Sequence, residues 1–360
     1  MTVKMRCLSA CMATLAMVLA MAVPASAADG APCQDSDKPC LLRAIRAHPA
    51  RLLAGWKEDL ARPLGERLAV APASLVDYLN LDNRLNDFPE RPRAAVLDAG
   101  FIDDVKGAIA GLPPALWQLF ERRLAGVYFV EELGGTGFTD FVADEAGRQV
   151  AGLIVLDAGV LKKQTANAWS TWKENTPFSA DPLYRLEARI ETEANDNRKN
   201  AIRYILLHEL GHVLSIGGNI HPPWNVDAAD IQSPSDYPFF SLSWTIDRAA
   251  KRYVSLFEAD FPQRRNLSYY FGAKLTAADM DATYANLQQT NFPSLYAATR
   301  PGDDFAEAFA SYVHVVLQRR SWQVTITRGG ELLKDFRACW DEPRCAGKRR
   351  LMEQILSSAR

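Results

Sequence analysis

The sequence predicts an α+β fold, because its strand-like segments are grouped ahead of two long helical patterns and do not alternate with helices. The strand-like segments fall within residues 126–156, and the helical patterns lie at about 195–216 and 301–320. A chain in which strands and helices alternate would instead indicate a parallel sheet covered by helices. With 360 residues, the chain can bury a full core in one large domain or in two.

Residues 1–27 have the layout of a secretory signal peptide. A positive start with Lys4 and Arg6 precedes an apolar run over residues 8–23, and the small-residue site Ala-Ser-Ala follows at 25–27. The run is short for a membrane-spanning helix, and later apolar runs are short or interrupted by charge. We therefore expect an exported protein, periplasmic or secreted, without stable membrane insertion after cleavage; a retained anchor is the alternative.

The charge balance gives no reason to expect nucleic acid as a partner. Removing residues 1–27 takes away two cations and no acids, so the formal net charge at pH 7 changes from −2 to −4. A weakly acidic chain has no net electrostatic attraction to a phosphate backbone.

Four cysteines lie beyond residue 27, and an even number in an exported chain indicates two disulfides. The segments CQDSDKPC and CWDEPRC hold two cysteines each, so the preferred pairs are Cys33–Cys40 and Cys339–Cys345. Crossed pairing, which would join the N-terminal region to the C-terminal region, is the alternative. A metal site built from these cysteines is less favoured, because they lack C-x-x-C spacing.

Residues 28–112 are expected to form a mostly helical N-terminal region. Helical signals begin near Leu41 and are interrupted by prolines, for example Pro63 and Pro72. The segment PPALWQLFERRL, which follows, has two prolines at a helix start and apolar residues at helical spacing. The N-terminal region can be a removable propeptide, an inhibitory cap or a permanent subdomain, and these alternatives stay open at this point.

Three segments after residue 125 have strand character. GVYFVEEL and FTDFV are rich in β-branched and aromatic residues, and residues 150–156 form a third apolar run. The segment TANAWSTWKENTPFSADP contains two prolines and is expected to be a loop. Near the C-terminus, WQVTITRGGELL is expected to form a short hairpin, and Lys348–Ala359 a last helix.

The segment YILLHELGHVLS contains the pattern H-E-x-x-H on a predicted helix that ends at Gly217-Gly218. His208 and His212 are four residues apart, so they stand on one helix face about 6 Å apart and can both reach one zinc ion. Glu209 lies too far round the helix to bind with them and is suited to take a proton from the attacking water. Gly211 indicates that another backbone packs closely here. A chance match on an amphipathic helix is the alternative.

A catalytic zinc ion normally takes three protein ligands, so a third residue is needed. The extended pattern H-E-x-x-H-x-x-G-x-x-H fails, because Ser215 and Gly218 occupy its glycine and third histidine positions. His221 is three residues late and is followed by two prolines. His221 is therefore not the expected ligand.

Glu307, in the segment DDFAEAFASYVH, is the expected third ligand. It shares a helix face with Asp303, while Phe305 and Phe309 form an apolar side that can anchor the helix. The alternative is a solvated face with Asp303 as the N-cap, since acids are common near a helix start.

HELGH, followed at a distance by DFAEAFA, resembles the gluzincin group of zincin metallopeptidases and is most similar to the lethal-factor type. The resemblance covers residues 113–320 in layout and only these two segments in sequence. It implies a zincin-like catalytic domain over 113–320, with an inserted helical subdomain at about 240–292. A C-terminal extension with an expected disulfide would follow at 321–360. The implied zinc ligands are His208, His212 and Glu307.

The resemblance also implies further parts of an active site. An oxyanion stabiliser is expected at Tyr296, with His221 and His314 as weaker candidates. Asp303 or Asp304 is expected to orient a ligand imidazole. A peptide substrate would lie along an edge strand, for which AGLIVLDAGVL is the best candidate unless it is an internal strand.

We therefore expect an exported metallopeptidase that uses one Zn²⁺ ion and acts on a peptide or protein substrate. Glu209 would be the general base and Tyr296 would stabilise the oxyanion. One alternative is a zinc amidase or other hydrolase that acts on cell-wall peptides with the same site. The other is a non-catalytic zinc-binding protein with a zincin fold, which the intact Glu209 argues against. No oligomeric state is indicated.

Overall fold

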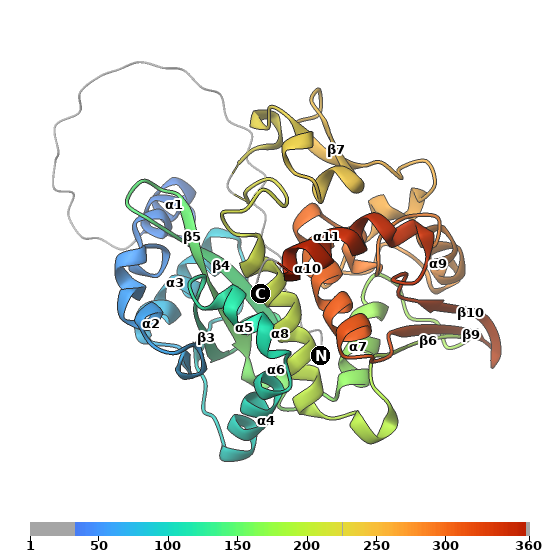
Figure 1. Cartoon of the computed structure of the whole chain (residues 1–360), viewed down its shortest axis with the longest axis horizontal. Helices are drawn as coiled ribbons and strands as arrows, with labels where there is room; N and C mark the ends of the chain where they lie inside the picture. The colour runs from blue at the N-terminus through green and yellow to red at the C-terminus, as the bar shows by residue number, and fades with distance from the viewer. Residues whose placement is uncertain (1–32, 225, 358–360) are drawn as a thin grey trace.

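The computed structural model describes residues 33–224 and 226–357 (Figure 1). The expected signal peptide at 1–27 lies outside the described residues. Within the described ranges, no helix combines the length and apolar character that crossing a bilayer requires. Helices and strands both contribute to the structure, in agreement with the expected α+β class.

The central element is a five-stranded mixed sheet with the strand order β1-β3-β5-β4, in which β2 also pairs with β3. β1, β3 and β5 run parallel, whereas β2 and β4 are antiparallel to their neighbours. The strands are β1 (Leu68–Val70), β2 (Arg93–Ala94), β3 (Leu124–Glu131), β4 (Gly137–Ala143) and β5 (Gln149–Asp157). The three strands predicted within residues 126–156 are therefore confirmed.

β3 and β5 are buried on both faces, which explains why their sequences are continuous apolar runs. On one face, Phe129 and Ile154 pack into a core that includes Leu206 of the motif helix. On the other face, Tyr128 and Val155 pack against the N-terminal region. The predicted edge strand AGLIVLDAGVL corresponds to β5, which lies inside the sheet between β3 and β4, so its alternative assignment as an internal strand is the correct one.

The N-terminal region is mostly helical, as expected, and forms part of the same core. Its helices are α1 (Lys38–Ala47), α2 (Lys57–Ala61), α3 (Ala73–Leu85), α4 (Ala99–Ala110) and, just beyond it, α5 (Pro114–Phe120). β1 and β2 come from this region and both pair with β3. Because removing the region would take two strands out of the sheet, this arrangement favours a permanent subdomain over a removable propeptide.

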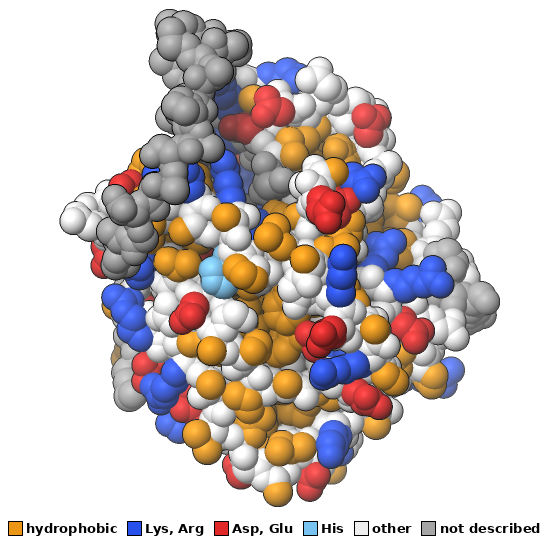
Figure 2. All heavy atoms as spheres, turned by 90° about the vertical axis from the view of Figure 1, so that its left-hand side faces the viewer, with side chains coloured by type: hydrophobic (Ala, Val, Ile, Leu, Met, Phe, Trp, Pro, Cys, Tyr) orange, Lys and Arg blue, Asp and Glu red, His pale blue; other side chains and the backbone are white. Residues whose placement is uncertain are grey.

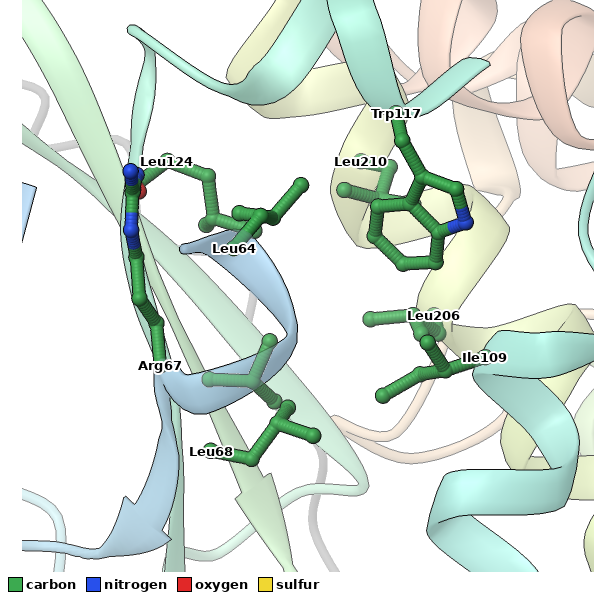
Figure 3. A pocket seen from close by; sticks show the side chains of 9 residues that line it. Leu64, Arg67, Leu68, Ile109, Trp117, Leu124, Leu206 and Leu210 are labelled. Carbon is green, nitrogen blue, oxygen red and sulfur yellow. The ribbon is translucent and has the colours of Figure 1, made fainter. Parts of the chain in front are cut away.

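Arg67 and two leucines fasten the N-terminal region to the rest of the core. The buried guanidinium of Arg67 donates hydrogen bonds to four carbonyl groups, including those of Glu121 and Leu124. Leu64 and Leu68 face α8 across a small apolar pocket (Figure 3). On the outer face of this half of the molecule, acidic, basic and hydrophobic side chains are interspersed (Figure 2).

Helices α8 (Arg198–Ser215) and α10 (Pro301–Ser311) carry the sequence motifs and pack against each other. The Asn197 side chain accepts the Asn200 N–H and caps the start of α8. A Cβ atom on Gly211 would lie 2.7 Å from the Cα atom of Ala306, so the close packing predicted at this glycine is confirmed. A π-helical turn, Tyr312–Leu317, continues α10 toward the end of the predicted helix.

A second, three-stranded sheet has the order β10-β9-β6 and lies beside α7. The predicted hairpin is confirmed as β9 (Gln323–Arg328) and β10 (Glu331–Arg337), and β6 (Tyr184–Arg189) joins it. The expected loop over TANAWSTWKENTPFSADP is wrong in its first part, which forms helix α7 (Ala166–Asn175). The Thr165 side chain, which accepts the Ala168 N–H, caps this helix.

Residues 240–292 are less helical than expected. They form a hairpin of β7 (Trp244–Asp247) and β8 (Arg252–Ser255), several 3-10 turns and one α-helix, α9 (Met280–Leu287). The last helix is confirmed as α11 (Ala346–Ser357), and a short helix α6 (Ala158–Leu161) follows β5. Tertiary contacts determine the secondary structure of this segment, because its β-hairpin packs aromatic residues against the main core.

Both preferred disulfides are present. Cys33 pairs with Cys40 and Cys339 pairs with Cys345, and the Cα atoms of each pair are 5.7 Å apart. Both pairs close short local loops, so crossed pairing between the two ends of the chain is wrong.

We predict that Gly211→Ala destabilises the protein although alanine is the better helix former. The new Cβ atom would meet the α10 backbone, and overpacking of this kind costs about 1–3 kcal/mol of the free energy of unfolding. Gly107→Ala is the matched control, because Gly107 also lies inside a helix and its new Cβ would meet only the flexible Lys199 side chain. Its stability should be unchanged or rise by up to about 1 kcal/mol. Denaturant unfolding measures both, and equal stability of the two variants would contradict the close crossing of α8 and α10.

Candidate metal centre

The two motif histidines lie on a helix whose side chains are buried almost throughout. His208 and His212 are 7% and 9% exposed, and their Nε2 atoms are 3.2 Å apart. Two nitrogen ligands of a tetrahedral ion with bonds of 2.0–2.1 Å would be separated by about 3.3 Å. The imidazoles are therefore already spaced for binding a single ion.

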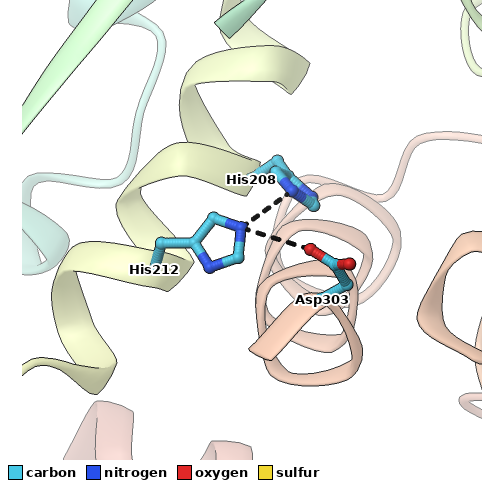
Figure 4. A group of neighbouring side chains, drawn as sticks. All are labelled: His208, His212 and Asp303. Atoms are coloured by element: carbon cyan, nitrogen blue, oxygen red, sulfur yellow. Dashed lines mark hydrogen bonds and ion pairs between the residues drawn. The ribbon is translucent and has the colours of Figure 1, made fainter. Parts of the chain in front are cut away.

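Asp303 completes a group that could hold a metal ion. Its Oδ1 atom lies 3.6 Å from Nε2 of His212, and the ligand atoms of His208, His212 and Asp303 all lie within 4.8 Å of one another. Figure 4 shows the three side chains pointing toward one another, with the histidines on α8 and Asp303 on α10. All three are buried, and each is carried by a helix packed in the core, so their positions are well fixed.

Glu307 approaches the other nitrogen of His208. Its Oε1 atom is 2.9 Å from Nδ1 of His208. Lys173 donates a hydrogen bond of 2.5 Å to the same oxygen, and the Ser294 hydroxyl donates one of 2.6 Å to Oε2. Burial alone would raise the pKa of Glu307, but Lys173 and His208 hold this pKa well below its ordinary value.

Asp303 and Glu307 thus approach different nitrogens of the two histidines. Asp303 was expected to orient an imidazole and lies at the Nε2 side, whereas Glu307 was expected at the metal and lies against Nδ1. The two acids are one helical turn apart on the same face of α10, so the way α10 crosses α8 decides which of them meets the ion. Asp304 is not part of the centre, because it pairs with Lys348 and accepts a hydrogen bond from Trp244.

Strand β4 holds Glu209. The Thr139 hydroxyl donates a hydrogen bond of 2.6 Å to its Oε2 atom. Oε1 faces Gly137, where a Cβ atom would come within 2.5 Å of it, so only glycine leaves room for this carboxylate. Burial raises the pKa of Glu209, which makes the ionised carboxylate a stronger base; a bound cation would act in the opposite direction.

Tyr296 lies beside the centre, in the 3-10 turn that precedes α10. Its ring centroid is 5.6 Å from that of His208, and the ring of Tyr269 packs edge-on against it at 4.7 Å. A small pocket adjoins these residues, and its lining comprises Thr136, Gly137, Trp169, Lys173, Ile205, His208, Glu209 and Tyr296.

The two remaining candidate histidines have different surroundings. His314 is buried away from the centre, where its Nε2 atom contacts the Ile190 carbonyl oxygen at 2.8 Å. His221 lies nearer to the centre, beside Gly302, the residue before Asp303: a Cβ atom on Gly302 would be 3.8 Å from Nε2 of His221. The Nδ1 atom of His221 contacts the Pro222 carbonyl oxygen. Neither belongs to the group of three that could hold the ion.

Aromatic side chains shield the centre from solvent. Trp224, in the loop after α8, has its ring 5.6 Å from that of His212 and 6.4 Å from that of Phe141 on β4. The Arg51 guanidinium lies 3.8 Å from the Phe141 ring centroid on the side of the N-terminal region.

Comparison with known proteins adds nothing to this geometry. No known protein family, curated protein or solved structure matches the chain. Function must therefore be inferred from the residues of the centre themselves.

Several residues of the centre were not predicted from the sequence. Lys173 was assigned to a loop, although Thr165 as an N-cap and the spacing of Ala166, Trp169 and Lys173 on one helix face were visible signals. Gly137 and Thr139 lie on a predicted strand, but nothing local shows that this strand faces Glu209.

We predict that Asp303 and Glu307 differ in their effect on metal affinity. Asp303→Asn should lower Zn²⁺ affinity by several orders of magnitude, because a ligand is lost. Glu307→Gln should lower it only about 10–100-fold, as is typical when a group that orients a ligand is removed. Competition with a chelator measures both, with His221→Ala as a control that keeps its affinity. Loss of the ion in Glu307→Gln together with its retention in Asp303→Asn would restore the ligand set expected from the sequence.

Proposed function

We propose that this protein is an exported, zinc-dependent metallopeptidase with a zincin-like catalytic domain. His208, His212 and Asp303 would hold one Zn²⁺ ion and leave one position open, as catalytic zinc sites do. The observation that carries the proposal is the position of Glu209. Its buried carboxylate lies next to this three-residue group and is held by an edge strand.

The donor set supports zinc over the common alkaline-earth ions. Two imidazole nitrogens and one carboxylate suit Zn²⁺, whereas Ca²⁺ and Mg²⁺ prefer oxygen ligands. When bound, the ion would act as a Lewis acid and lower the pKa of water at its open position.

Glu209 would act as the general base of peptide hydrolysis. The hydrogen bond from Thr139 engages Oε2, so Oε1, which packs beside Gly137, is the atom that would take the proton from the attacking water. The same atom can then deliver the proton to the leaving amine. The raised pKa of the buried carboxylate supports both steps.

Tyr296 is the proposed donor to the developing oxyanion. Its ring lies next to the ring of His208 and is fixed by Tyr269 and by the Lys173 ammonium, which is 4.4 Å from its centroid. A group that stabilises charge in the transition state must be held in place before the reaction, and this packing provides that.

A peptide substrate is supported by the position of β4. This strand lies at the edge of the main sheet and contacts Glu209 through Gly137 and Thr139. An extended peptide can pair with an exposed strand edge, which would bring its backbone past the base. A non-catalytic metal site is disfavoured. Burying the Glu209 carboxylate costs free energy, and a site that only holds a metal ion has no use for this carboxylate.

We predict that Glu209→Gln abolishes peptide hydrolysis and retains Zn²⁺. Loss of a general base lowers the rate by about 10²–10⁴-fold, and Glu209 does not belong to the ligand group. Hydrolysis of a peptide library, followed by mass spectrometry, and metal content measure the two effects, with exposed Glu193→Gln as the control. Full activity of Glu209→Gln would exclude the mechanism. Cleavage of cell-wall peptides alone by the native protein would instead assign the centre to an amidase.

We predict that Tyr296→Phe lowers kcat about 10²–10³-fold, as expected when one oxyanion donor is lost. Zn²⁺ affinity should stay unchanged, because the substitution removes a hydroxyl and keeps the ring that packs against His208. Steady-state kinetics and chelator competition separate the two quantities. A variant with native kcat would show that another group stabilises the oxyanion.

A further inference from the structure

A cation, a carboxylate and an imidazole lie in contact with one another beside the candidate metal centre. Lys173, on α7, is 3% exposed, and its Nζ atom lies 2.5 Å from Oε1 of Glu307. The same oxygen lies 2.9 Å from Nδ1 of His208. The ammonium group therefore contacts the same carboxylate oxygen that approaches the imidazole.

We propose that Lys173 is a positioning residue of the metal centre, which fixes Glu307 so that His208 presents Nε2 to the ion. The proposal rests on the proposed function, because it concerns the same centre. Lys173 does not belong to the group that could hold the ion, and in this role it acts through Glu307.

The energetics of burial support a role beyond packing. Bringing an ammonium group and a carboxylate out of water is expensive, and an apolar pair of similar volume is often as stable or more stable. The other buried positions on this side of α7 are Ala166, Trp169 and Ser170, which are small or aromatic and carry no charge, so α7 does not need a charged residue here for packing. The pair does, however, neutralise Glu307, which lets an ionised carboxylate stand behind His208 in the core.

Glu307 is held from both ends, which limits how it can turn. Lys173 engages Oε1, and the Ser294 hydroxyl engages Oε2 at 2.6 Å. A planar carboxylate fixed at both oxygens keeps one orientation toward Nδ1 of His208. A carboxylate held this close to Nδ1 of His208 favours the tautomer that carries its proton on Nδ1, which leaves Nε2 to bind the ion.

The ammonium group also contacts the proposed oxyanion donor. It lies 4.4 Å from the ring centroid of Tyr296 and 5.5 Å from that of Trp169. Cations at such distances from aromatic faces are attracted to them. One side chain thus packs against Tyr296 and orients the group behind His208.

Glu174, the residue after Lys173, fixes the rotation of α7 about its axis. Glu174 is buried and accepts hydrogen bonds from the hydroxyls of Tyr284 at 2.7 Å and Tyr269 at 3.3 Å. With Glu174 fixed on its own side, α7 cannot rotate without breaking these bonds. This anchoring keeps the Lys173 ammonium directed at Glu307.

A second buried ion pair, Lys348–Asp304, serves as a control, because neither of its residues has a hydrogen bond or ion pair to the two histidines within the described ranges. Lys348 is also buried and pairs with Asp304, the neighbour of Asp303 on α10. Both lysines neutralise a buried acid of the same helix, but Asp304 contacts Trp244 and not an imidazole. Lys348→Met therefore removes a buried ion pair without removing an orienting group.

The test measures Zn²⁺ affinity by chelator competition for the native protein, Lys173→Met and Lys348→Met. Lys173→Met should bind Zn²⁺ about 10–100-fold more weakly, as expected when the support of a ligand is lost. Lys348→Met should keep its affinity within about threefold, although both variants lose stability in denaturant unfolding. Lys173→Gln, whose shorter side chain still ends in an N–H donor, should show a smaller loss and serves if the methionine variant does not fold.

A double-mutant cycle tests whether Lys173 acts through Glu307. In the Glu307→Gln background, Lys173→Met should weaken Zn²⁺ binding no further, because the group it supports is gone. Native affinity in both Lys173 variants, or additive losses in the cycle, would overturn the proposal while leaving the peptidase function intact. Failure of the native protein to bind Zn²⁺ would overturn the proposed function, and the role of Lys173 with it.

Discussion

The close crossing of α8 and α10 is the constraint on which the candidate centre depends. Gly211 allows the two backbones to approach, because any larger residue would meet Ala306. At this separation, the two imidazoles of one helix and the Asp303 carboxylate of the other come within reach of a common ion. Loops could bring the same side chains together, but two packed helices hold them with far less motion.

This crossing also places three acids of α10 in the core, and each has a different partner. Asp303 faces the histidines, Asp304 pairs with Lys348, and Glu307 pairs with Lys173 and contacts His208. A buried carboxylate is tolerated only when its charge is neutralised or well hydrogen-bonded. The partners of these acids therefore determine which one is available to an ion. Glu307 and Asp304 are each paired with a lysine, whereas Asp303 faces the two histidines.

The sequence predicts the local parts of this centre and not the relations between them. The motif on α8, the acidic helix and the three strands follow periodicity, so they could be recognised. Asp303 and Glu307 share one helix face, and only the tertiary crossing separates their roles. Lys173 was missed because prolines and polar residues after it made α7 resemble a loop. Strand order is likewise not a local property, so the sequence left open whether β5 is an edge or an internal strand, and β4 forms the edge.

The edge strand connects the N-terminal region to the proposed chemistry. β4 holds Glu209 through Thr139, and the neighbouring Asp140 is fixed from the N-terminal region by Arg51 at 2.8 Å and by the Tyr78 hydroxyl. Because successive strand residues point to opposite faces of the sheet, Asp140 is bound by Arg51 and Tyr78 on one face, while Thr139 contacts Glu209 on the other. The N-terminal region thus supports the strand that positions Glu209, which gives it a structural role in the same unit as the metal centre.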